Sequence, residues 1–158
     1  MKTEIVSPEW SVLLALQRAV HATMHMLATE LADLNLTASE INALANLGDA
    51  RSPTVSELAA ATGNRPTTLT SVLDRLERRG HIARGARPGD RRAVLVQLTP
   101  SGRQAAATIR QAITDLERRA LGALPADSVA GLRTALQALT EAPARQRTWS
   151  SRSAGRAG

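Results

Sequence analysis

The sequence predicts a mainly α-helical protein with one small β-hairpin. Apolar residues recur at steps of three or four through most of the chain, which is the helical period. Residues 93–98, AVLVQL, instead place apolar side chains at alternate positions, as a strand does. Phe and Tyr are absent from the 158 residues, so leucine, alanine, valine and isoleucine must form the core, which suits helix packing. We expect one domain over residues 1–141.

The N-terminal segment predicts a long helix over residues 9–34. Its apolar positions are Leu13, Leu16, Val20, Met24, Leu27, Leu31 and Leu34. Leu14 and Met26 widen this apolar surface beyond what one partner helix needs, so part of it is available to a second subunit.

Two short helices follow, each with a capping box at its start. Thr37 with Glu40, and Thr54 with Glu57, have the spacing in which a threonine caps the helix and a glutamate returns to the cap backbone. A third helix is predicted from Pro66, with Asn64 as its cap. Its buried edge carries Leu69, Val72, Leu73 and Leu76, and Gly80 ends it. Two short helices joined by Thr62-Gly63-Asn64 predict a helix-turn-helix.

A hairpin is expected directly after this pair of helices. Residues 81–84 and 93–98 are its two predicted strands, and the loop RGARPGD between them contains two glycines and a proline. A basic hairpin that follows a helix-turn-helix is a wing, so residues 36–99 predict a winged helix-turn-helix lobe.

The C-terminal part predicts two more helices and a tail. Thr99 caps a helix that begins at Pro100 and extends to about Leu121, and residues 125–142 form the last helix. Residues 142–158 lack apolar periodicity and add four arginines, so we expect a disordered basic tail.

Positive charge is concentrated in residues 65–92. This segment holds eight arginines and three acidic residues, a net charge of +5, and the whole chain has a formal net charge of +6. Such clustering indicates a nucleic-acid contact surface. Single-stranded nucleic acid is usually bound by stacking on aromatic rings, and this chain has only Trp10 and Trp149. Duplex DNA is therefore the expected partner.

The outer face of the predicted helix at 66–79 is rich in short hydroxyl side chains. Thr67, Thr68, Thr70 and Ser71 are poor helix formers, which costs about 1–2 kcal/mol relative to alanine-like residues. Short hydroxyls would let the helix lie deep in a major groove, and Arg75 is long enough to reach a guanine or a phosphate. The alternative is a solvated face with local capping hydroxyls.

The hairpin tip carries Arg87, Arg91 and Arg92 beside Asp90. An arginine can insert into a narrow minor groove, and Asp90 is placed to orient the Arg92 guanidinium through a paired hydrogen bond. The alternative is a charged loop that serves solubility. The residues expected to contact DNA are Arg65, Thr67, Thr68, Thr70, Ser71, Arg75, Arg87, Asp90, Arg91 and Arg92.

Other classes of function find little support in the residues. Cysteine is absent, which excludes disulfides, thiolate metal sites and thiol catalysis. There is no glycine-rich phosphate loop, no nucleophile paired with a base and no paired carboxylates, so we expect neither an enzyme nor a cofactor. The N-terminus has no signal pattern and no apolar run approaches about 18 residues, which predicts a soluble cytoplasmic protein. Nineteen arginines against one lysine suggest a GC-rich bacterial genome.

The first helix holds a histidine pair with a nearby arginine. His21 and His25 have the i, i+4 spacing that can bind a metal ion, although packing or hydrogen bonding is the more common role of such a pair. Arg18 lies one turn before them. Arg18 with His21 or His25 could bind a carboxylate effector.

Five segments in order resemble the multiple-antibiotic-resistance regulator (MarR) family of winged-helix transcription factors. They are LTASEINAL, TVSELAAATG, RPTTLTSVLDRLERRGHIAR, PGDRRAVLVQLTPSGRQ and the closing helix pair, within residues 9–141. The most specific part is Asp90-x-Arg92, followed by Val96, Leu98, Thr99 and Gly102.

The resemblance implies a homodimer in which residues 9–34 and 100–141 form the dimerisation helices. It places residues 66–79 in the major groove and Arg92 in the minor groove of a pseudo-palindromic operator. It also implies a repressor that a small, often phenolic or anionic, ligand releases from DNA. The near absence of aromatic residues disfavours a phenolic effector, and the absence of cysteine excludes the family's peroxide sensing. Two alternatives are a weakly specific architectural DNA-binding protein and a helical module whose basic face binds an acidic protein.

Overall fold

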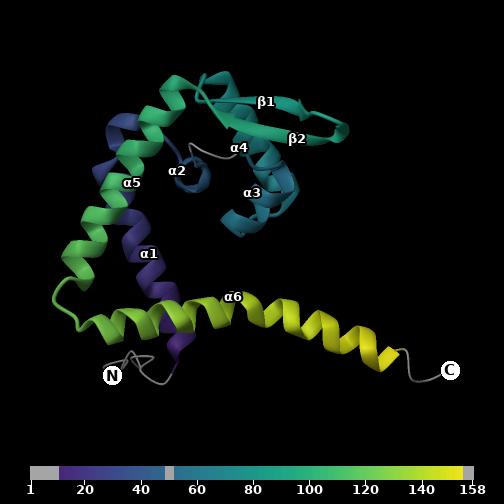
Figure 1. Ribbon diagram of the computed structural model, residues 1–158. Helices are drawn as coiled ribbons and strands as arrows, with labels where there is room; N and C mark the ends of the chain where they lie inside the picture. The colour runs from purple at the N-terminus through teal and green to yellow at the C-terminus, as the bar shows by residue number, and fades with distance from the viewer. Residues whose placement is uncertain (1–10, 49–51, 155–158) are drawn as a thin grey trace, which may run out of the picture. The chain divides into compact units, whose positions relative to one another are not determined.

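The computed structural model describes residues 11–48 and 52–154, with side chains described as far as Ala142 except for Arg91. Its elements are α1 (Val12–Glu30), η1 (Ala32–Leu34), α2 (Ala38–Asn46), α3 (Val55–Thr62), α4 (Pro66–Arg78), β1 (Ile82–Arg87), β2 (Asp90–Leu98), α5 (Pro100–Leu121) and α6 (Ala126–Ala154) (Figure 1). This confirms the predicted fold class of helices with one hairpin. The chain forms two compact units, one up to Asp115 and one from Leu116.

The first helix is shorter than the predicted range of 9–34. Ser11 caps α1 by accepting a hydrogen bond from the Leu14 amide at 3.3 Å. After Glu30 the chain tightens into η1, and Asn35 adopts a left-handed conformation with φ 50° that ends it. Residues 9 and 10 lie outside the described part of the chain. Within the apolar surface of α1, Leu27 is buried while Val12, Leu13 and Val20 are more than half exposed.

Both predicted capping boxes are present. The Thr37 hydroxyl accepts from the Glu40 amide, and the Thr54 hydroxyl accepts from the Glu57 amide, with the glutamates returning to the cap backbone. The predicted Asn64 cap of α4 is wrong, since Arg65 occupies the N-cap position without a side-chain hydrogen bond. The Asn64 amide instead donates to Ala59 at 3.1 Å, after Gly63 with φ 68°. Asn64 therefore completes the end of α3.

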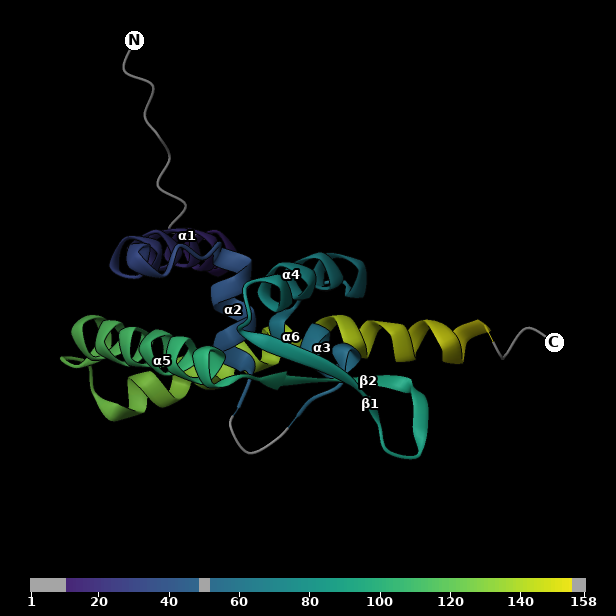
Figure 2. The same ribbon diagram turned by 90° about the horizontal axis from the view of Figure 1, so that it is seen from above.

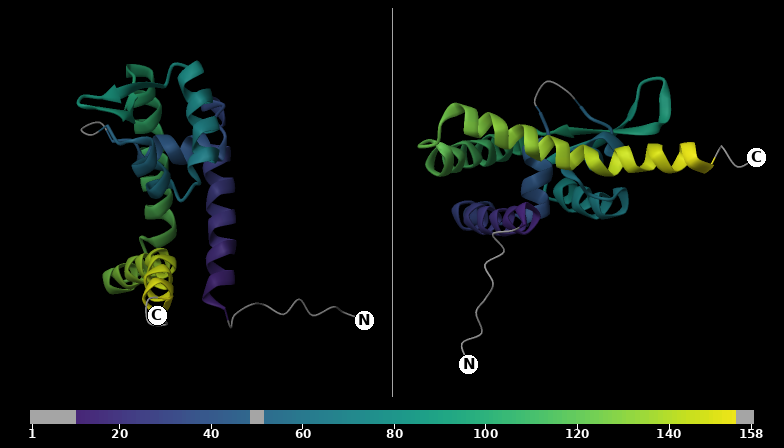
Figure 3. Two further views of the ribbon diagram at one scale, coloured as in Figure 1. Left: turned by 90° about the vertical axis from the view of Figure 1, so that its right-hand side faces the viewer. Right: turned by 90° about the horizontal axis from the view of Figure 1, so that it is seen from below.

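The core of the winged helix-turn-helix lobe is aliphatic. All four residues of the predicted buried edge of α4, Leu69, Val72, Leu73 and Leu76, have at most 1% exposure. They pack with α2 and α3, which contact α4 and each other, and with the hairpin, which contributes Ile82 and Val96. Each fully buried leucine of this kind contributes about 1.5–3 kcal/mol. Figures 2 and 3 show α3 and α4 beside the hairpin.

The hairpin is longer than the pattern predicted. β1 and β2 pair antiparallel from Ile82↔Leu98 to Arg87↔Asp90, and only Pro88 and Gly89 link them. Gly89 has φ 82°, which the second central position of a proline-glycine turn requires. The sequence placed the loop at RGARPGD, but Gly85 is paired with Leu95. The pairing shifts after Ala86, so residues 91–93 of β2 form a bulge.

A further backbone connection joins the hairpin to the loop before α3. The Val96 amide donates to the Pro53 carbonyl at 2.9 Å, and Thr54 forms an isolated bridge with Leu95. No sequence pattern predicts this connection, because it spans only two residues and one of them is a proline. It attaches the N-terminus of α3 to the wing.

The predicted cap of α5 is confirmed. The Thr99 hydroxyl accepts from the Gly102 amide at 3.1 Å and donates to the Gly80 carbonyl, so it joins the end of the α4 segment to the start of α5. Gly102 packs directly on the His81 carbonyl.

The last helix continues past the predicted end at Ala142 and extends to Ala154. Apolar side chains recur on α6 only as far as Leu139, so periodicity gave no sign of the extension. The disorder of residues 142–158 and the single domain over 1–141 stay predictions. Within the described residues, no helix is both long and apolar enough to cross a bilayer.

Candidate nucleic-acid interface

The outer face of α4 presents the predicted hydroxyl cluster. Thr67, Thr68, Thr70 and Ser71 are all exposed. The Thr70 hydroxyl donates to the Pro66 carbonyl at 2.9 Å, and the Ser71 hydroxyl donates to the Thr68 carbonyl at 2.8 Å. Because these protons are used within the helix, the two oxygens face outward mainly as acceptors. Such acceptors suit the amino groups of adenine and cytosine in a major groove.

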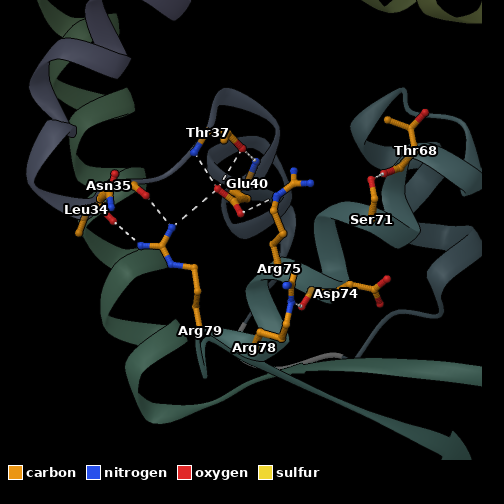
Figure 4. Close-up of polar contacts among 10 residues, drawn as sticks. All are labelled: Leu34, Asn35, Thr37, Glu40, Thr68, Ser71, Asp74, Arg75, Arg78 and Arg79. Atoms are coloured by element: carbon orange, nitrogen blue, oxygen red, sulfur yellow. Dashed lines mark hydrogen bonds and ion pairs between the residues drawn. The ribbon is translucent and has the colours of Figure 1, made fainter.

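Arg75 is attached to a buried carboxylate rather than extended into solvent. Its Nε donates to Glu40 Oε1 at 3.1 Å, and the Glu40 side chain is 2% exposed whereas that of Arg75 is 39% exposed. Figure 4 shows Arg75 reaching from α4 to Glu40 on α2, while Asp74 points away from this pair. The sequence pattern predicted only a capping role for Glu40. Its buried position and its arginine partner are a tertiary effect with no local signal.

Glu40 remains ionised at neutral pH although it is buried. Burial disfavours the charged form, but hydrogen bonds from the Thr37 amide at 2.7 Å and the Thr37 hydroxyl at 2.9 Å, together with Arg75, outweigh it. The net result is a pKa for Glu40 below its ordinary value of 4.5. The carboxylate therefore stabilises the folded lobe in its charged form.

Because the pKa of Glu40 is lowered, we expect the folded protein to lose stability in acid. The Glu40→Gln variant, which has no carboxylate at this position, should lack this contribution to the pH dependence. Because the folded-state pKa lies below the unfolded one, the stabilisation is complete above pH 4.5 and is lost as the pH falls through the folded-state pKa. Denaturant unfolding of both proteins at a series of pH values measures it. We expect the difference in unfolding free energy between wild type and variant to be constant above pH 4.5 and to shrink below it. A difference that stays constant into acid would contradict this role of the charge.

Arg79 has a structural position within the basic cluster. Its guanidinium donates to the Asn35 carbonyl and, at 3.0 Å, to the Leu34 carbonyl, and it lies 3.9 Å from Glu40 Oε2 (Figure 4). These bonds fasten the end of α4 to the segment between η1 and α2. Arg75, Arg78 and Arg79 with Asn35, Thr37 and Glu40 line an open pocket of about 340 Å³.

Arg84, which was not among the predicted site residues, joins the wing to α4. Its guanidinium donates to Glu77 at 2.6 and 3.0 Å and to Asp74 at 2.7 Å, and its amide donates to Glu77 at 3.1 Å. The hydrogen bonds with Glu77 are the main cause of a raised Arg84 pKa, and they also lower the pKa of Glu77. The only acids in α4 therefore fix the wing against the helix. Their i, i+3 spacing on an otherwise basic helix was the available signal.

Asp90 orients the backbone of Arg92 rather than its guanidinium. Asp90 Oδ1 accepts from the Arg92 amide at 2.9 Å, and the described residues contain no ion pair between the two side chains. The prediction that the Arg92 guanidinium donates to Asp90 is therefore wrong, because the donor is the Arg92 backbone amide. An aspartate side chain most easily reaches the amide two residues further along the chain. The bond holds the bulged part of β2. Arg87 and Arg92 are exposed, and the Arg91 side chain lies outside the described residues.

One groove joins the hydroxyl-bearing outer face of α4 to the hairpin. It has a volume of about 510 Å³. Its lining comes from three elements: Thr54, Val55 and Ser56 at the start of α3, Thr70 on α4, and Arg84, Asp90, Arg92, Ala93 and Val94 of the hairpin. Among the predicted contact residues, the structure thus brings together Thr70, Asp90 and Arg92. Arg65, Thr67 and Thr68 lie outside this groove, and Arg75 lines the pocket around Glu40.

The proposed effector residues lie on α1. Arg18 and His21 line an open pocket of about 430 Å³ with Leu14 and Gln17, and His25 is not part of it. His21 and His25 are both exposed. Over the described part of the chain, no three His, Asp or Glu side chains gather in a way that could hold a metal ion.

Comparison with known proteins identifies the family. The family model described as MarR family matches residues 36–94, which include α2 to α4 and most of the hairpin. The multiple antibiotic resistance protein MarR of Salmonella typhimurium is 35% identical over 108 residues, covering 68% of this chain and 75% of that protein. The chain belongs to the MarR family. Membership makes it a transcriptional regulator with a DNA-binding winged helix.

Solved structures of MarR-family proteins have the same fold. BpsR of Bordetella bronchiseptica is 26% identical to this chain and has a TM-score of 0.71. The match covers 83% of this chain and 94% of BpsR, whose structure was solved to explain how 6-hydroxynicotinic acid regulates its DNA binding. CouR of Rhodococcus jostii RHA1, bound to p-coumaroyl-CoA, is 23% identical with a TM-score of 0.74, over 82% of this chain and 92% of that one. The second likeness is of fold alone.

Proposed function

We propose that this MarR-family regulator is a homodimeric, sequence-specific repressor of a pseudo-palindromic operator in duplex DNA. The observation that carries the proposal is the shared groove, in which Thr70 of α4 and Arg92 of the wing line one surface. A helix that enters the major groove and a wing that reaches the adjacent minor groove must face the same stretch of duplex. Arg84, held by Asp74 and Glu77, fixes the two elements at one relative position.

In this proposal the two elements have different tasks. The helix would contact base edges and phosphates through Arg65, Thr67, Thr68, Thr70, Ser71 and Arg75. The wing would supply Arg87, Arg91 and Arg92, with Asp90 holding the backbone of the bulge. Specificity then depends chiefly on α4, and much of the electrostatic affinity on the wing.

Exposed leucines support the dimer. Large apolar side chains are uncovered on α1 and on α6, including Leu13 at 56% and Leu132 at 42% exposure. Exposed apolar side chains gathered on one helix mark an interaction site. A second copy of the chain is the partner we propose, because a two-fold dimer matches a two-fold operator.

The Leu136→Glu variant is expected to be a monomer. Leu132, Leu136 and Leu139 follow the helical period on α6, and a charge buried in a dimer interface without a partner is strongly unfavourable. Thr134→Glu adds the same charge two residues away on a different face and should leave the dimer intact. Light scattering coupled to size-exclusion chromatography measures the mass of each. A dimeric Leu136→Glu protein would place the interface elsewhere.

Arg18 and His21 are the proposed site of a small carboxylate effector. They share a pocket on α1, where a guanidinium can bind a carboxylate through two hydrogen bonds. The regulation of BpsR by 6-hydroxynicotinic acid supports a carboxylate of this kind as the effector.

Calorimetric titration of aromatic acids such as 6-hydroxynicotinic acid tests this site. We expect heat of binding with wild type and none with Arg18→Ala, whereas His25→Ala, outside the pocket, should bind as wild type does. No heat with wild type for any aromatic acid would contradict the effector proposal.

Sequencing of genomic fragments bound by the protein tests the function itself. The proposal predicts one motif with two inverted half-sites about one helical turn apart, near 34 Å. Recovery of fragments without a common motif would contradict it and favour a weakly specific DNA-binding protein.

A further inference from the structure

We propose that Glu40 is a positioning residue for base recognition. Its buried carboxylate holds Arg75 by Nε, so that the two terminal nitrogens of the guanidinium are presented to one guanine of the operator. The inference rests on the proposed DNA-binding function and deepens it. It assigns specificity to a residue on α2, which is not the helix proposed to enter the groove.

The Glu40 carboxylate is itself fixed on both oxygens. Oε2 accepts from the Thr37 amide at 2.7 Å and from the Thr37 hydroxyl at 2.9 Å, and Oε1 accepts from Arg75 Nε at 3.1 Å. The Thr37 amide belongs to the backbone at the start of α2, so it cannot move without unwinding the cap. Glu40 is therefore a rigid anchor rather than a flexible surface partner.

This anchor determines which edge of Arg75 is available. A guanidinium has five N–H donors, one on Nε and two on each terminal nitrogen. Since Nε is directed at Glu40, the remaining donors are those of Nη1 and Nη2. Two such nitrogens can donate together to O6 and N7 of guanine, which is the most frequent specific contact in major grooves. An arginine held in this way also loses less conformational freedom on binding than a free one.

The neighbouring arginines have other attachments. Arg79 donates to the Leu34 and Asn35 carbonyls, which fastens the chain just before Thr37 (Figure 4). Arg78 donates from Nε to the Asp74 carbonyl at 3.2 Å, within its own helix. Among these three arginines, Arg75 is thus the one whose Nε is bound by the buried carboxylate of another helix. This is why base preference, rather than general affinity, should depend on Glu40.

Glutamine at position 40 separates the two roles of the side chain. Glutamine also serves in a capping box, so its amide oxygen can accept from Thr37 as the carboxylate does. Its amide nitrogen then faces Arg75 Nε, and two donors oppose each other. Glu40→Gln keeps the cap and releases Arg75.

Base preference is measured by selecting bound duplexes from a randomised library and sequencing them. Wild type, Glu40→Gln, Arg75→Lys and the double variant are compared at one salt concentration, with thermal unfolding recorded for each. Arg75→Lys keeps a cation for Glu40 but removes the planar fork, so it identifies the base position that Arg75 reads. Glu57→Gln, the same change in the capping box of α3, is the matched control.

We expect wild type to prefer guanine at one position of each half-site by about ten- to a hundredfold. Arg75→Lys and Glu40→Gln should both reduce this preference to within about threefold at that position, and the double variant should lose no more than either single variant. Glu57→Gln should keep the wild-type preference. Unchanged guanine preference in either single variant, or additive losses in the double variant, would overturn the inference. A wild-type protein without base preference at any position would instead overturn the proposed function itself.

Discussion

Replacement of Gly102 by alanine is expected to lower the free energy of unfolding by about 3 kcal/mol. A Cβ at this position would lie well inside van der Waals contact with the His81 carbonyl and 3.2 Å from a methyl group of Leu98. The Gly102 amide is bonded to the Thr99 hydroxyl, and the Thr99 amide donates to the same His81 carbonyl at 3.1 Å. The clash therefore acts on backbone that is held from both sides and cannot move by a change of rotamer.

Chemical denaturation at a fixed protomer concentration measures this loss. Gly131→Ala is the matched control, because nothing lies within 4 Å of a Cβ built at Gly131 of α6. That control should be neutral or stabilising by up to about 1 kcal/mol, since alanine is the better helix former. If Gly102→Ala and wild type had the same free energy of unfolding, the close packing of Gly102 against the His81 carbonyl would be contradicted.

Replacement of Arg92 by alanine is expected to weaken binding to the operator by about 1–3 kcal/mol. Arg92 is exposed in the groove that the wing shares with α4, and Asp90 fixes its backbone rather than its charged group. The guanidinium is therefore free to enter a minor groove, where the negative potential is strongest over A·T-rich sequence.

Fluorescence anisotropy with a labelled operator duplex measures the affinity. Arg133→Ala removes the same charge from α6, outside the winged helix-turn-helix lobe, and should change the affinity by less than about 0.5 kcal/mol. If Arg92→Ala bound as tightly as wild type, the wing would not lie in a groove, and a helical module with a different partner would become the better description.

Local signals predicted much of the lobe. The features that were predicted correctly depend on residues within one or two helical turns of each other. They are the capping boxes at Thr37 and Thr54, the threonine cap of α5 and the buried edge of α4. The predictions failed where neighbouring elements share residues. Asn64 has the composition of a helix cap, but the left-handed Gly63 before it commits its amide to α3.

The connections within the candidate site depend on contacts between distant residues. Glu40 and Arg75 are 35 positions apart, so the pattern that identified Glu40 as a cap could not show its ion pair. Arg84 looked like one more member of a basic cluster, yet its charge is directed at Asp74 and Glu77. Composition pointed to the candidate site, whereas the division of its arginines into structural and exposed ones required the fold.

The most direct test of the whole account is equilibrium competition for the wild-type protein between two unlabelled duplexes of equal length. One carries the motif selected from genomic fragments and the other a scrambled version of it, each titrated against the labelled motif at about 0.15 M salt. Sequence-specific recognition predicts that the motif competes at least about a thousandfold better than the scrambled duplex. Equal competition by the two duplexes would contradict it.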